Sequence, residues 1–239
     1  MNKKVVIVIP ARYKSTRFPG KPLIMLKGIP MVIRVAQICE HVVPRESIII
    51  ATESDKIINV VEQYNFRGVL TSDDNLTGTD RVAEAVQNIE CDIVINVQGD
   101  EPLILPEDIQ KVIDEKKKYP DYVINAMTEF DPHTNTVNIP KVVTNENYDL
   151  LYMSRSLIPG TKSMQFDYKT LKQVCIYAFN KKELSVFKKF GRKTYLEGLE
   201  DIEILRFLDL GIKIKMIRVS SASLAIDIPE DVQLVESKL

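Results

Sequence analysis

The sequence predicts a doubly wound α/β fold built on a mostly parallel sheet. The first observation is that residues 5–9 are all β-branched, as expected for a strand buried on both faces of a parallel sheet. The second is a series of similar apolar runs, at 47–51, 68–71 and 92–97. The third is a set of helical patterns between these runs, at 31–41, 54–64 and 82–89. Strands that alternate with helices this closely predict right-handed βαβ units. Ser54 is expected to cap the second of these helices.

The second half of the chain has a less regular pattern. Its expected strands lie at 123–127, 142–144, 150–153, 173–179 and 213–219, and its expected helices at 181–190 and 196–210. A last helix is expected to begin with Pro229 in its first turn. The polar stretch 160–170 is expected to form a loop or lid. No linker separates domains, so residues 1–239 are expected to form a single domain.

The composition is that of a globular protein, with 45% hydrophobic and 27% charged residues. No apolar run is long enough to span a bilayer, and the first residues do not resemble a secretion signal. The protein is therefore expected to be cytoplasmic, with no membrane partner. The three cysteines, Cys39, Cys91 and Cys175, are scattered and are expected to be buried thiols rather than disulfides or metal ligands.

Positive charge is concentrated at the start of the chain. The formal net charge is −1, yet every charged residue before Glu40 is Lys or Arg. A local positive field in a near-neutral protein favours a polyanionic small molecule over nucleic acid, whose binders carry a broader basic surface. From charge alone, a solvated basic loop is an equally good interpretation.

The loop that follows the first strand, residues 10–22, is the first candidate site. Ligands of doubly wound sheets bind beyond the carboxyl ends of the strands. The loop has neither P-loop nor dinucleotide-binding spacing. Arg12, Arg17 and Lys21, together with the hydroxyls of Ser15 and Thr16, can nevertheless hold a triphosphate, because guanidinium groups bind phosphate bidentately. Cations fixed here would stabilise the pyrophosphate that leaves during nucleotidyl transfer.

Two acidic segments are candidates for a magnesium site. Asp100, in the segment 97–102, leaves the carboxyl end of a buried strand, where it can hold Mg²⁺ against phosphate oxygens. The alternative there is a simple Gly-Asp turn closed by proline. Asp227, in the segment 225–231, is a second candidate ligand. Considered without outside help, Asp227 is better interpreted as the N-cap of the last helix.

Taken together, these segments resemble the 3-deoxy-manno-octulosonate (Kdo) cytidylyltransferase family, also called CMP-Kdo synthetases. IPARYKSTRFPGKPL at 9–23 is similar to the phosphate loop of that family, TGTDR at 77–81 to its SGT(E/D)R segment, and VQGDEP at 97–102 to its strand-end motif. YMSRSLIP at 152–159 resembles YFSRSxIP, LExxExxExxR at 196–206 resembles the late acidic helix, and IDIPED at 226–231 stands where the family has VDTPED. The resemblance spans nearly the whole chain in order.

The resemblance implies an enzyme that couples CTP to Kdo, an acidic sugar, giving CMP-Kdo and pyrophosphate for lipopolysaccharide or capsule synthesis. It implies a nucleotide-diphospho-sugar transferase-like fold with an inserted sugar-binding and dimerisation subdomain at about 123–179, and hence a homodimer. Mg²⁺ is the implied cofactor. It would orient the α-phosphate and help to ionise the attacking hydroxyl of the sugar.

The resemblance also assigns roles to residues on the nucleotide side. The implied catalytic and phosphate-holding residues are Arg12, Arg17, Lys21 and Asp100, with Ser15 and Thr16 beside them. The implied magnesium ligands are Asp100 and Asp227. The residues implied to help to seat the cytidine are Thr79 and Arg81.

On the sugar side the implied residues are Gln98, Tyr152 and Arg155, the last pairing with the sugar carboxylate. Most departures from the family also lie on this side. Gln173 and Cys175 replace the histidine and glycine of HxGIY, Ile204 replaces a glutamine, and residues 160–162 replace an aromatic residue and an arginine. Ile228 replaces the threonine of VDTPED.

Because a lost polar contact commonly changes which substrate is recognised, the identity of the sugar stays open. An amino-substituted sugar, 8-amino-Kdo, and a sialic-acid-like nonulosonate are the alternatives within enzymes. A catalytically inactive nucleotide-binding homologue is the alternative from another class, and the retained Asp100, Asp227, Arg17 and Lys21 weigh against it.

Overall fold

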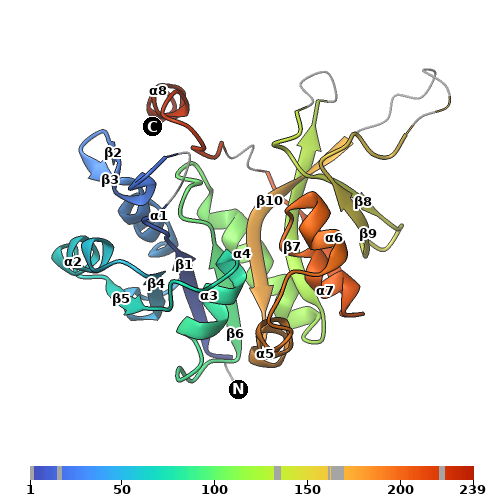
Figure 1. Cartoon of the computed structure of the whole chain (residues 1–239), viewed down its shortest axis with the longest axis horizontal. Helices are drawn as coiled ribbons and strands as arrows, with labels where there is room; N and C mark the ends of the chain where they lie inside the picture. The colour runs from blue at the N-terminus through green and yellow to red at the C-terminus, as the bar shows by residue number, and fades with distance from the viewer. Residues whose placement is uncertain (1–2, 15–17, 132–135, 161, 163–169, 221–223) are drawn as a thin grey trace.

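The computed structural model describes residues 3–14, 18–131, 136–160, 162, 170–220 and 224–239. Its centre is a large sheet with helices on both faces (Figure 1). The strands of the first half are β1 Val5–Pro10, β4 Ile48–Thr52, β5 Arg67–Leu70 and β6 Ile93–Val97. The main strand order is β11-β7-β10-β6-β1-β4-β5, in which only β10 runs antiparallel to its neighbours. The predicted mostly parallel α/β fold is confirmed.

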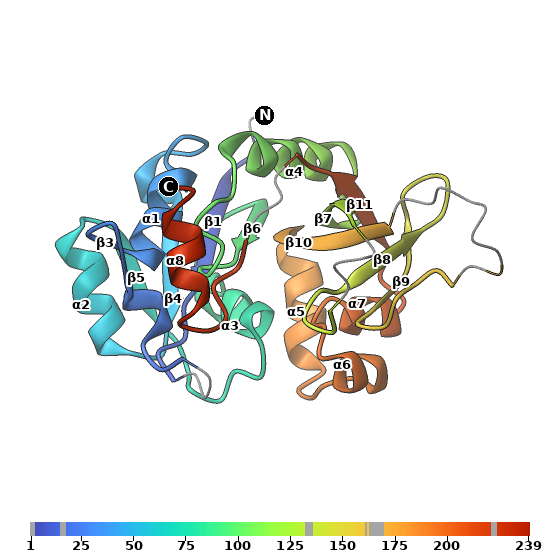
Figure 2. The ribbon, with the colours of Figure 1, turned by 90° about the horizontal axis from the view of Figure 1, so that it is seen from above.

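The strands at the centre of this sheet are buried on both faces, as their β-branched sequences predict. Ile7 and Ile9 of β1 belong to one apolar cluster and Val6 and Val8 to another. The helices of the α/β layers are α1 Met31–Cys39, α2 Asp55–Gln63, α3 Gly78–Ala85, α4 Pro106–Lys118 and α5 Lys181–Lys189. Helices α1, α2 and α4 contribute to the first cluster and α3 and α5 to the second, so the two sets cover opposite faces (Figure 2).

Two details of these helices differ from the sequence predictions. Ser54 occupies the N-cap position of α2, but its side chain makes no capping hydrogen bond. Helix α4 was not among the predicted elements. Its sequence nevertheless carries helix signals, with Pro106 in the first turn and lysines in the last turn.

The second half contributes strands to the main sheet and an arm that stands off it (Figure 1). Its strands are β7 Val123–Phe130, β8 Lys141–Thr144, β9 Leu150–Ser154, β10 Thr170–Phe179 and β11 Ile214–Arg218. Strands β7 and β10 lie in the main sheet. Strand β8 pairs with the beginning of β10, and β9 pairs with β8. The stretch predicted as an insertion therefore includes two main-sheet strands, while its division into domains stays a prediction. Most of the predicted lid at 160–170 lies outside the described residues.

The prediction of a single helix at 196–210 is wrong. The structure has two short helices, α6 Tyr195–Glu200 and α7 Leu205–Asp209, separated by Asp201 in the left-handed conformation at φ 49°. The carbonyl oxygens of Glu200 and Asp201 accept hydrogen bonds from the Arg155 guanidinium. These carbonyls at the end of α6 are thus satisfied by a side chain instead of by the next helical turn.

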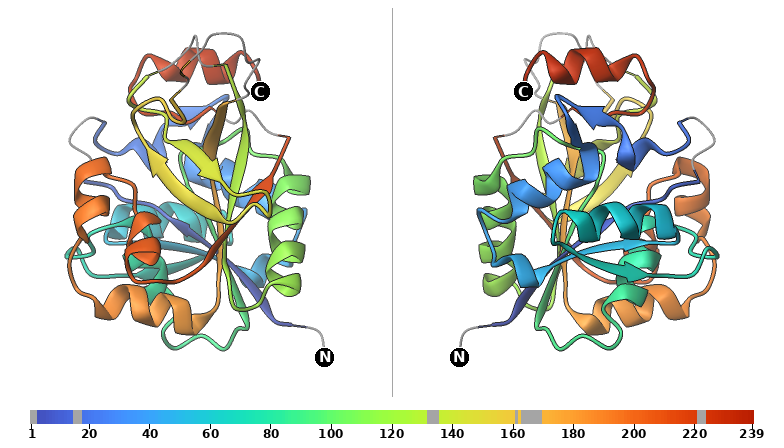
Figure 3. Two further views of the ribbon diagram at one scale, coloured as in Figure 1. Left: turned by 90° about the vertical axis from the view of Figure 1, so that its right-hand side faces the viewer. Right: turned by 90° about the vertical axis from the view of Figure 1, so that its left-hand side faces the viewer.

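The C-terminal segment lies against the region that follows β1. A short 3-10 turn, Lys21–Leu23, leads into the hairpin of β2 Met25–Leu26 and β3 Ile29–Pro30. A third apolar cluster joins Leu26 to Ile226 and to Val235 of helix α8 Asp231–Glu236. Helix α8 thus lies at the end of the sheet where β1 and β6 finish (Figure 3). It begins two residues after Pro229, so the prediction that Pro229 lies in its first turn is wrong.

The remaining described features agree with the composition. A second 3-10 turn, Arg45–Ser47, leads into β4. All three cysteines are free thiols, but only Cys39 is buried as predicted, whereas Cys91 and Cys175 are half-buried. Among the described residues, no helix combines the length and apolar character that crossing a membrane requires.

Candidate active site

The loops after β1 and β6 lie side by side because the two strands are parallel neighbours. The Lys21 ammonium lies 2.7 Å from an Asp100 carboxylate oxygen and 3.6 Å from an Asp227 oxygen. It also donates to the carbonyl of Ile226 at 2.8 Å, and the Ile226 amide donates to the Asp100 carbonyl at 3.0 Å. Three predicted residues from distant segments therefore meet at the carboxyl edge of the sheet.

The donor set at this point fits a magnesium ion. Mg²⁺ takes oxygen ligands and is often held by one or two carboxylates together with substrate phosphates. The side chains of Asp100 and Asp227 are 29% and 37% exposed, so both carboxylates can be reached from solvent. Within the described ranges, no group of three or more His, Cys, Asp or Glu side chains is arranged to hold a metal. Two carboxylates would leave the other ligand positions to phosphate oxygens and water.

The alternative role of Asp227 as a helix cap is wrong. The N-cap position of α8 is held by Glu230, three residues after Asp227. The hydrogen bonds run the other way, because the amides of Asp227 and Ile228 both donate to Asp231 Oδ2. Asp231 thus holds the segment that carries Asp227, whose carboxylate lies beside Lys21.

The described parts of the phosphate loop are fixed at several points. Arg12 is exposed to solvent, and the amide of Gly20 donates to the carbonyl of Tyr13 at 3.0 Å, which closes the loop. Gly20 has φ 72°, a conformation that favours glycine. Ser15, Thr16 and Arg17 lie outside the described residues, so their predicted contacts with phosphate stay predictions.

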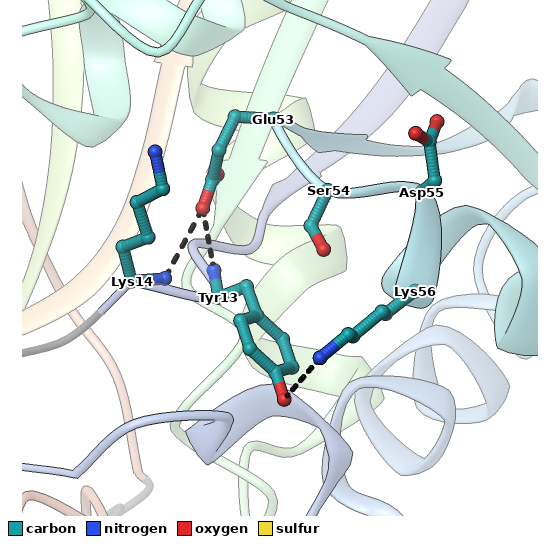
Figure 4. A pocket seen from close by; sticks show the side chains of 6 residues that line it. All are labelled: Tyr13, Lys14, Glu53, Ser54, Asp55 and Lys56. Atoms are coloured by element: carbon teal, nitrogen blue, oxygen red, sulfur yellow. Dashed lines mark hydrogen bonds between the residues drawn. The ribbon is translucent and has the colours of Figure 1, made fainter.

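Glu53, just beyond β4, holds the start of this loop and was missed by sequence reasoning. One of its carboxylate oxygens accepts from the amides of Tyr13 and Lys14, at 2.8 and 3.2 Å. Figure 4 shows these bonds beside a pocket of about 380 Å³ lined by Tyr13, Lys14 and residues 53–56. The Lys56 ammonium lies 4.8 Å from the centre of the Tyr13 ring in the same pocket. Only the position of Glu53 after a strand, as for Asp100, could have identified it.

Thr79 and Arg81 lie in the first turns of α3, which Thr77 caps by accepting from the Asp80 amide. Arg81 is buried and pairs with Glu53 at 3.2 Å. Burial lowers the pKa of Arg81, and the charge of Glu53 acts in the opposite direction. The Thr79 amide donates to Glu203 at 2.9 Å. Both residues are thus held by contacts with other residues of the chain. Their role at the cytidine stays a prediction.

Asp80 connects α3 to the second half through a buried ion network that was also missed. The Arg206 guanidinium is fully buried and lies 2.8 Å from Asp80 and 2.6 Å from Glu197. It also stacks over the Phe187 ring at 3.7 Å. Its signal in the sequence was the pair of charged motifs, TGTDR and the late acidic helix, that supply its members.

The predicted sugar-side residues fall into two groups. Gln98 donates to Glu203 at 3.3 Å, and burial raises the pKa of that carboxyl group. Tyr152 and the amide of Arg155 both donate to Glu200, at 3.3 and 2.8 Å. The guanidinium of Arg155 donates to the carbonyls of Val137 and Asp201, both at 2.9 Å, and to other carbonyls nearby. The structure therefore brings Tyr152 and Arg155 together, and the pairing of Arg155 with a sugar carboxylate stays a prediction.

Two of the positions that depart from the family lie near these groups. Gln173 donates to Asn125 at 3.0 Å, next to a register shift in β10 between Val174 and Tyr177. Ile204 is 1% exposed and packs in the apolar cluster of the second half. Burial also raises the pKa of Tyr177 well above its ordinary value.

The comparison with known families includes every segment of this site except the C-terminal one. A family model described as cytidylyltransferase matches residues 6–214. The chain belongs to the cytidylyltransferase family. The family predicted from the motifs is confirmed, and so is the predicted class of enzyme.

Similar cytidylyltransferases cover the chain almost from end to end. The 3-deoxy-manno-octulosonate cytidylyltransferase of Chloroherpeton thalassium is 37% identical, over 99% of this chain and 98% of its own. The 8-amino-3,8-dideoxy-manno-octulosonate cytidylyltransferase of Shewanella sp. (strain W3-18-1) is 39% identical, over 98% of each chain. The solved structure of a CMP:2-keto-3-deoxy-manno-octonic acid synthetase complexed with CTP matches with a TM-score of 0.92 at 32% identity, over 98% of each chain.

Proposed function

We propose that this cytidylyltransferase couples CTP to Kdo and releases CMP-Kdo and pyrophosphate. The observation that carries the proposal is the convergence of Lys21, Asp100 and Asp227 at the carboxyl ends of β1 and β6. A strongly similar structure is a complex with CTP, which supports CTP as the nucleotide. The product would serve lipopolysaccharide or capsule synthesis.

In this proposal the cations of the first loop bind the triphosphate. Arg12, Arg17 and Lys21 hold its oxygens, with Ser15 and Thr16 as hydroxyl partners. The anomeric oxygen of the sugar forms a bond to the α-phosphorus and releases its proton to solvent. The bond from the α-phosphorus to the oxygen that bridges the α- and β-phosphates breaks, and pyrophosphate leaves. Lys21 stabilises the charge that the leaving group gains. Lys21 would have to exchange part of its contact with Asp100 for phosphate.

Asp100 and Asp227 are the residues that would hold Mg²⁺. The ion would supply charge neutralisation at the phosphates and increase the acidity of the sugar hydroxyl. Thr79 and Arg81 are proposed to help to seat the cytidine. Gln98, Tyr152 and Arg155 are proposed to contact the sugar, Arg155 through the sugar carboxylate.

The second candidate is the same reaction on 8-amino-Kdo. It is favoured by Glu203, a half-buried carboxyl group beside Gln98, which could meet the additional ammonium group of that sugar. The changes at Gln173 and Ile204 lie on the same side of the site. Relatives of both kinds have similar identities, 37% and 39%, so identity does not favour either sugar.

The environment and assembly of the enzyme are also proposals. A cytoplasmic homodimer, with the segment at about 123–179 forming the dimer surface, is what the family resemblance implies. Analytical ultracentrifugation of the purified chain would test the dimer directly, and a monomer at micromolar concentration would contradict it.

The function is tested by measuring pyrophosphate release with CTP and Mg²⁺. Kdo, 8-amino-Kdo and N-acetylneuraminate are offered in parallel, with the Asp100→Ala enzyme as a control. Turnover on Kdo that the variant lacks would support the proposal. Turnover on only one of the other acids would support the same reaction with a different sugar. No turnover on any of them would favour the alternative of a catalytically inactive nucleotide-binding homologue.

A further inference from the structure

The start of the phosphate loop, just after β1, forms hydrogen bonds with β4 and with Glu53, the residue that follows β4. The amide of Ala11 donates to the carbonyl of Ala51 at 2.9 Å, one residue beyond the paired register of β1 and β4. Backbone pairing ends there. The next amides of the loop, those of Tyr13 and Lys14, donate to the side chain of Glu53 at 2.8 and 3.2 Å. Glu53 thus continues the attachment of the loop where the sheet ladder stops.

The same carboxylate also holds the segment that begins α3. The second oxygen of Glu53 lies 3.2 Å from the Arg81 guanidinium, and both side chains are only 3% exposed. Arg81 also donates to the hydroxyl of Thr71, just beyond β5. The buried pair of Glu53 and Arg81 therefore connects the ends of β1, β4 and β5 to α3.

Burial decides how strongly this contact fixes the loop. A buried carboxylate is costly unless its charge is paired and hydrogen-bonded. At Glu53, Oε1 accepts from two amides, and Oε2 forms an ion pair with the Arg81 guanidinium but has no hydrogen-bond partner among the described residues. Arg12 acts on Arg81 as a like charge. Among the carboxylates whose charges oppose this effect at Arg81, Glu53 acts most strongly, ahead of Glu84 and Asp73.

We infer that Glu53 is a positioning residue for the nucleotide: it fixes the start of the phosphate loop and Arg81 in one arrangement. With 3% exposure its side chain is not available to the substrate, so it acts through the loop and Arg81. The inference rests on the proposed function, because it takes the loop to bind the triphosphate of CTP.

The kinetic test replaces Glu53 by glutamine, which keeps the size of the side chain and removes its charge. Hydrogen bonds to charged groups are worth enough that the KM for CTP is expected to rise about tenfold or more. The KM for the sugar is expected to stay within about twofold, since the contact lies on the nucleotide side. Calorimetric titration with CTP alone is expected to show the same loss of affinity.

The matched control is Glu183→Gln, which breaks another buried ion pair. Lys116 lies 2.8 Å from Glu183, and these side chains are 1% and 7% exposed. Both variants are expected to lower the melting temperature, but only Glu53→Gln should raise the KM for CTP. If the two variants lose stability alike and neither changes the KM for CTP, Glu53 is merely structural and the inference is overturned.

A second measurement uses the unaltered protein and does not depend on the variant folding. Without nucleotide, the amides of Tyr13 and Lys14 are expected to be protected from hydrogen exchange, because a buried carboxylate accepts them. Exchange at the rate of an unstructured peptide would overturn the inference. This measurement needs no turnover, so a failure of the proposed function would show separately, as absent pyrophosphate release.

Discussion

The proposed phosphate side and the proposed sugar side of the site hold their charged groups in different ways. On the proposed phosphate side, Lys21 pairs with both Asp100 and Asp227, and the three side chains are 16%, 29% and 37% exposed. On the sugar side, the guanidinium of Arg155 donates to main-chain carbonyls, and Glu203 accepts from an amide and from Gln98.

This difference indicates that the two groups of residues would respond differently to a ligand. The groups proposed for the phosphate side come from the loops after β1 and β6 and from the segment before α8. They meet solvent, so a triphosphate and a cation can exchange with their mutual contacts. The sugar-side groups hold the segments around them together, so replacing one of them should affect both stability and sugar binding. The predictions below test this contrast, from the largest expected effect to the smallest.

The largest effect is expected for Asp100→Asn, which keeps the shape and removes the charge proposed to hold Mg²⁺. We expect kcat to fall by about a thousandfold, because charge stabilisation at the reacting phosphate would be lost. Pyrophosphate release measures it. The matched control is Asp92→Asn, at the opposite end of β6, where the carboxylate accepts from the Lys4 amide. Equal losses in the two variants would contradict a special role for Asp100.

The next effect is expected for Lys21→Met, which removes the cation between the two carboxylates. Loss of one charge-assisted contact to phosphate should lower kcat/KM for CTP by about a hundredfold. The exposed Lys117→Met is the control, since Lys117 pairs with a neighbouring aspartate on α4, away from the site. A KM for the sugar that changes more than the KM for CTP would argue against placing Lys21 on the phosphate side.

A smaller effect, on two properties at once, is expected for Arg155→Ala. The loss of hydrogen bonds to main-chain carbonyls should lower the free energy of unfolding by about 2 kcal/mol, measured by urea denaturation. The KM for the sugar should also rise. The control, Arg218→Ala, removes a half-exposed guanidinium that pairs with Glu129 and should cost less than about 1 kcal/mol. An unchanged KM for the sugar would restrict Arg155 to holding the chain.

The smallest effect is expected for Glu203→Gln, which should change how the stability of the folded chain depends on pH. Burial raises the pKa of Glu203 above 4.5, so between these two pKa values the folded chain keeps a proton that the unfolded chain has lost. The contribution of Glu203 to stability therefore falls as the pH rises through this window. Relative to the unaltered chain, Glu203→Gln should therefore become more stable as the pH rises above 4.5. Thermal melts would show it.

The control for this comparison is Glu90→Gln, whose side chain is 94% exposed. Its stability relative to the unaltered chain should change little over the same range, because an exposed carboxyl group has a similar environment in the unfolded chain. A parallel change in both variants would mean that the pH dependence does not come from the buried position of Glu203.

The sequence by itself determined the parallel half of the fold and the sheet edge at which the residues proposed to bind phosphate lie. Runs of β-branched residues identify buried parallel strands, and ligands bind beyond the carboxyl ends of such strands. Lys21 and Asp100 follow two of these strands, so the sequence alone assigns both residues to the same edge of the sheet. The family motifs added Asp227. Local patterns were sufficient here because strand burial depends on short apolar segments.

Only the tertiary structure decided the remaining features, because each depends on groups far apart in the chain. Arg155 binds the carbonyls at the end of α6 and so divides a helix that periodicity predicted as continuous. Asp227 lies beside Lys21 because α8 packs on the β2–β3 hairpin, whereas local sequence favoured a helix cap. Glu53 has no motif, and its partners at Tyr13, Lys14 and Arg81 are brought to it by the order of the strands.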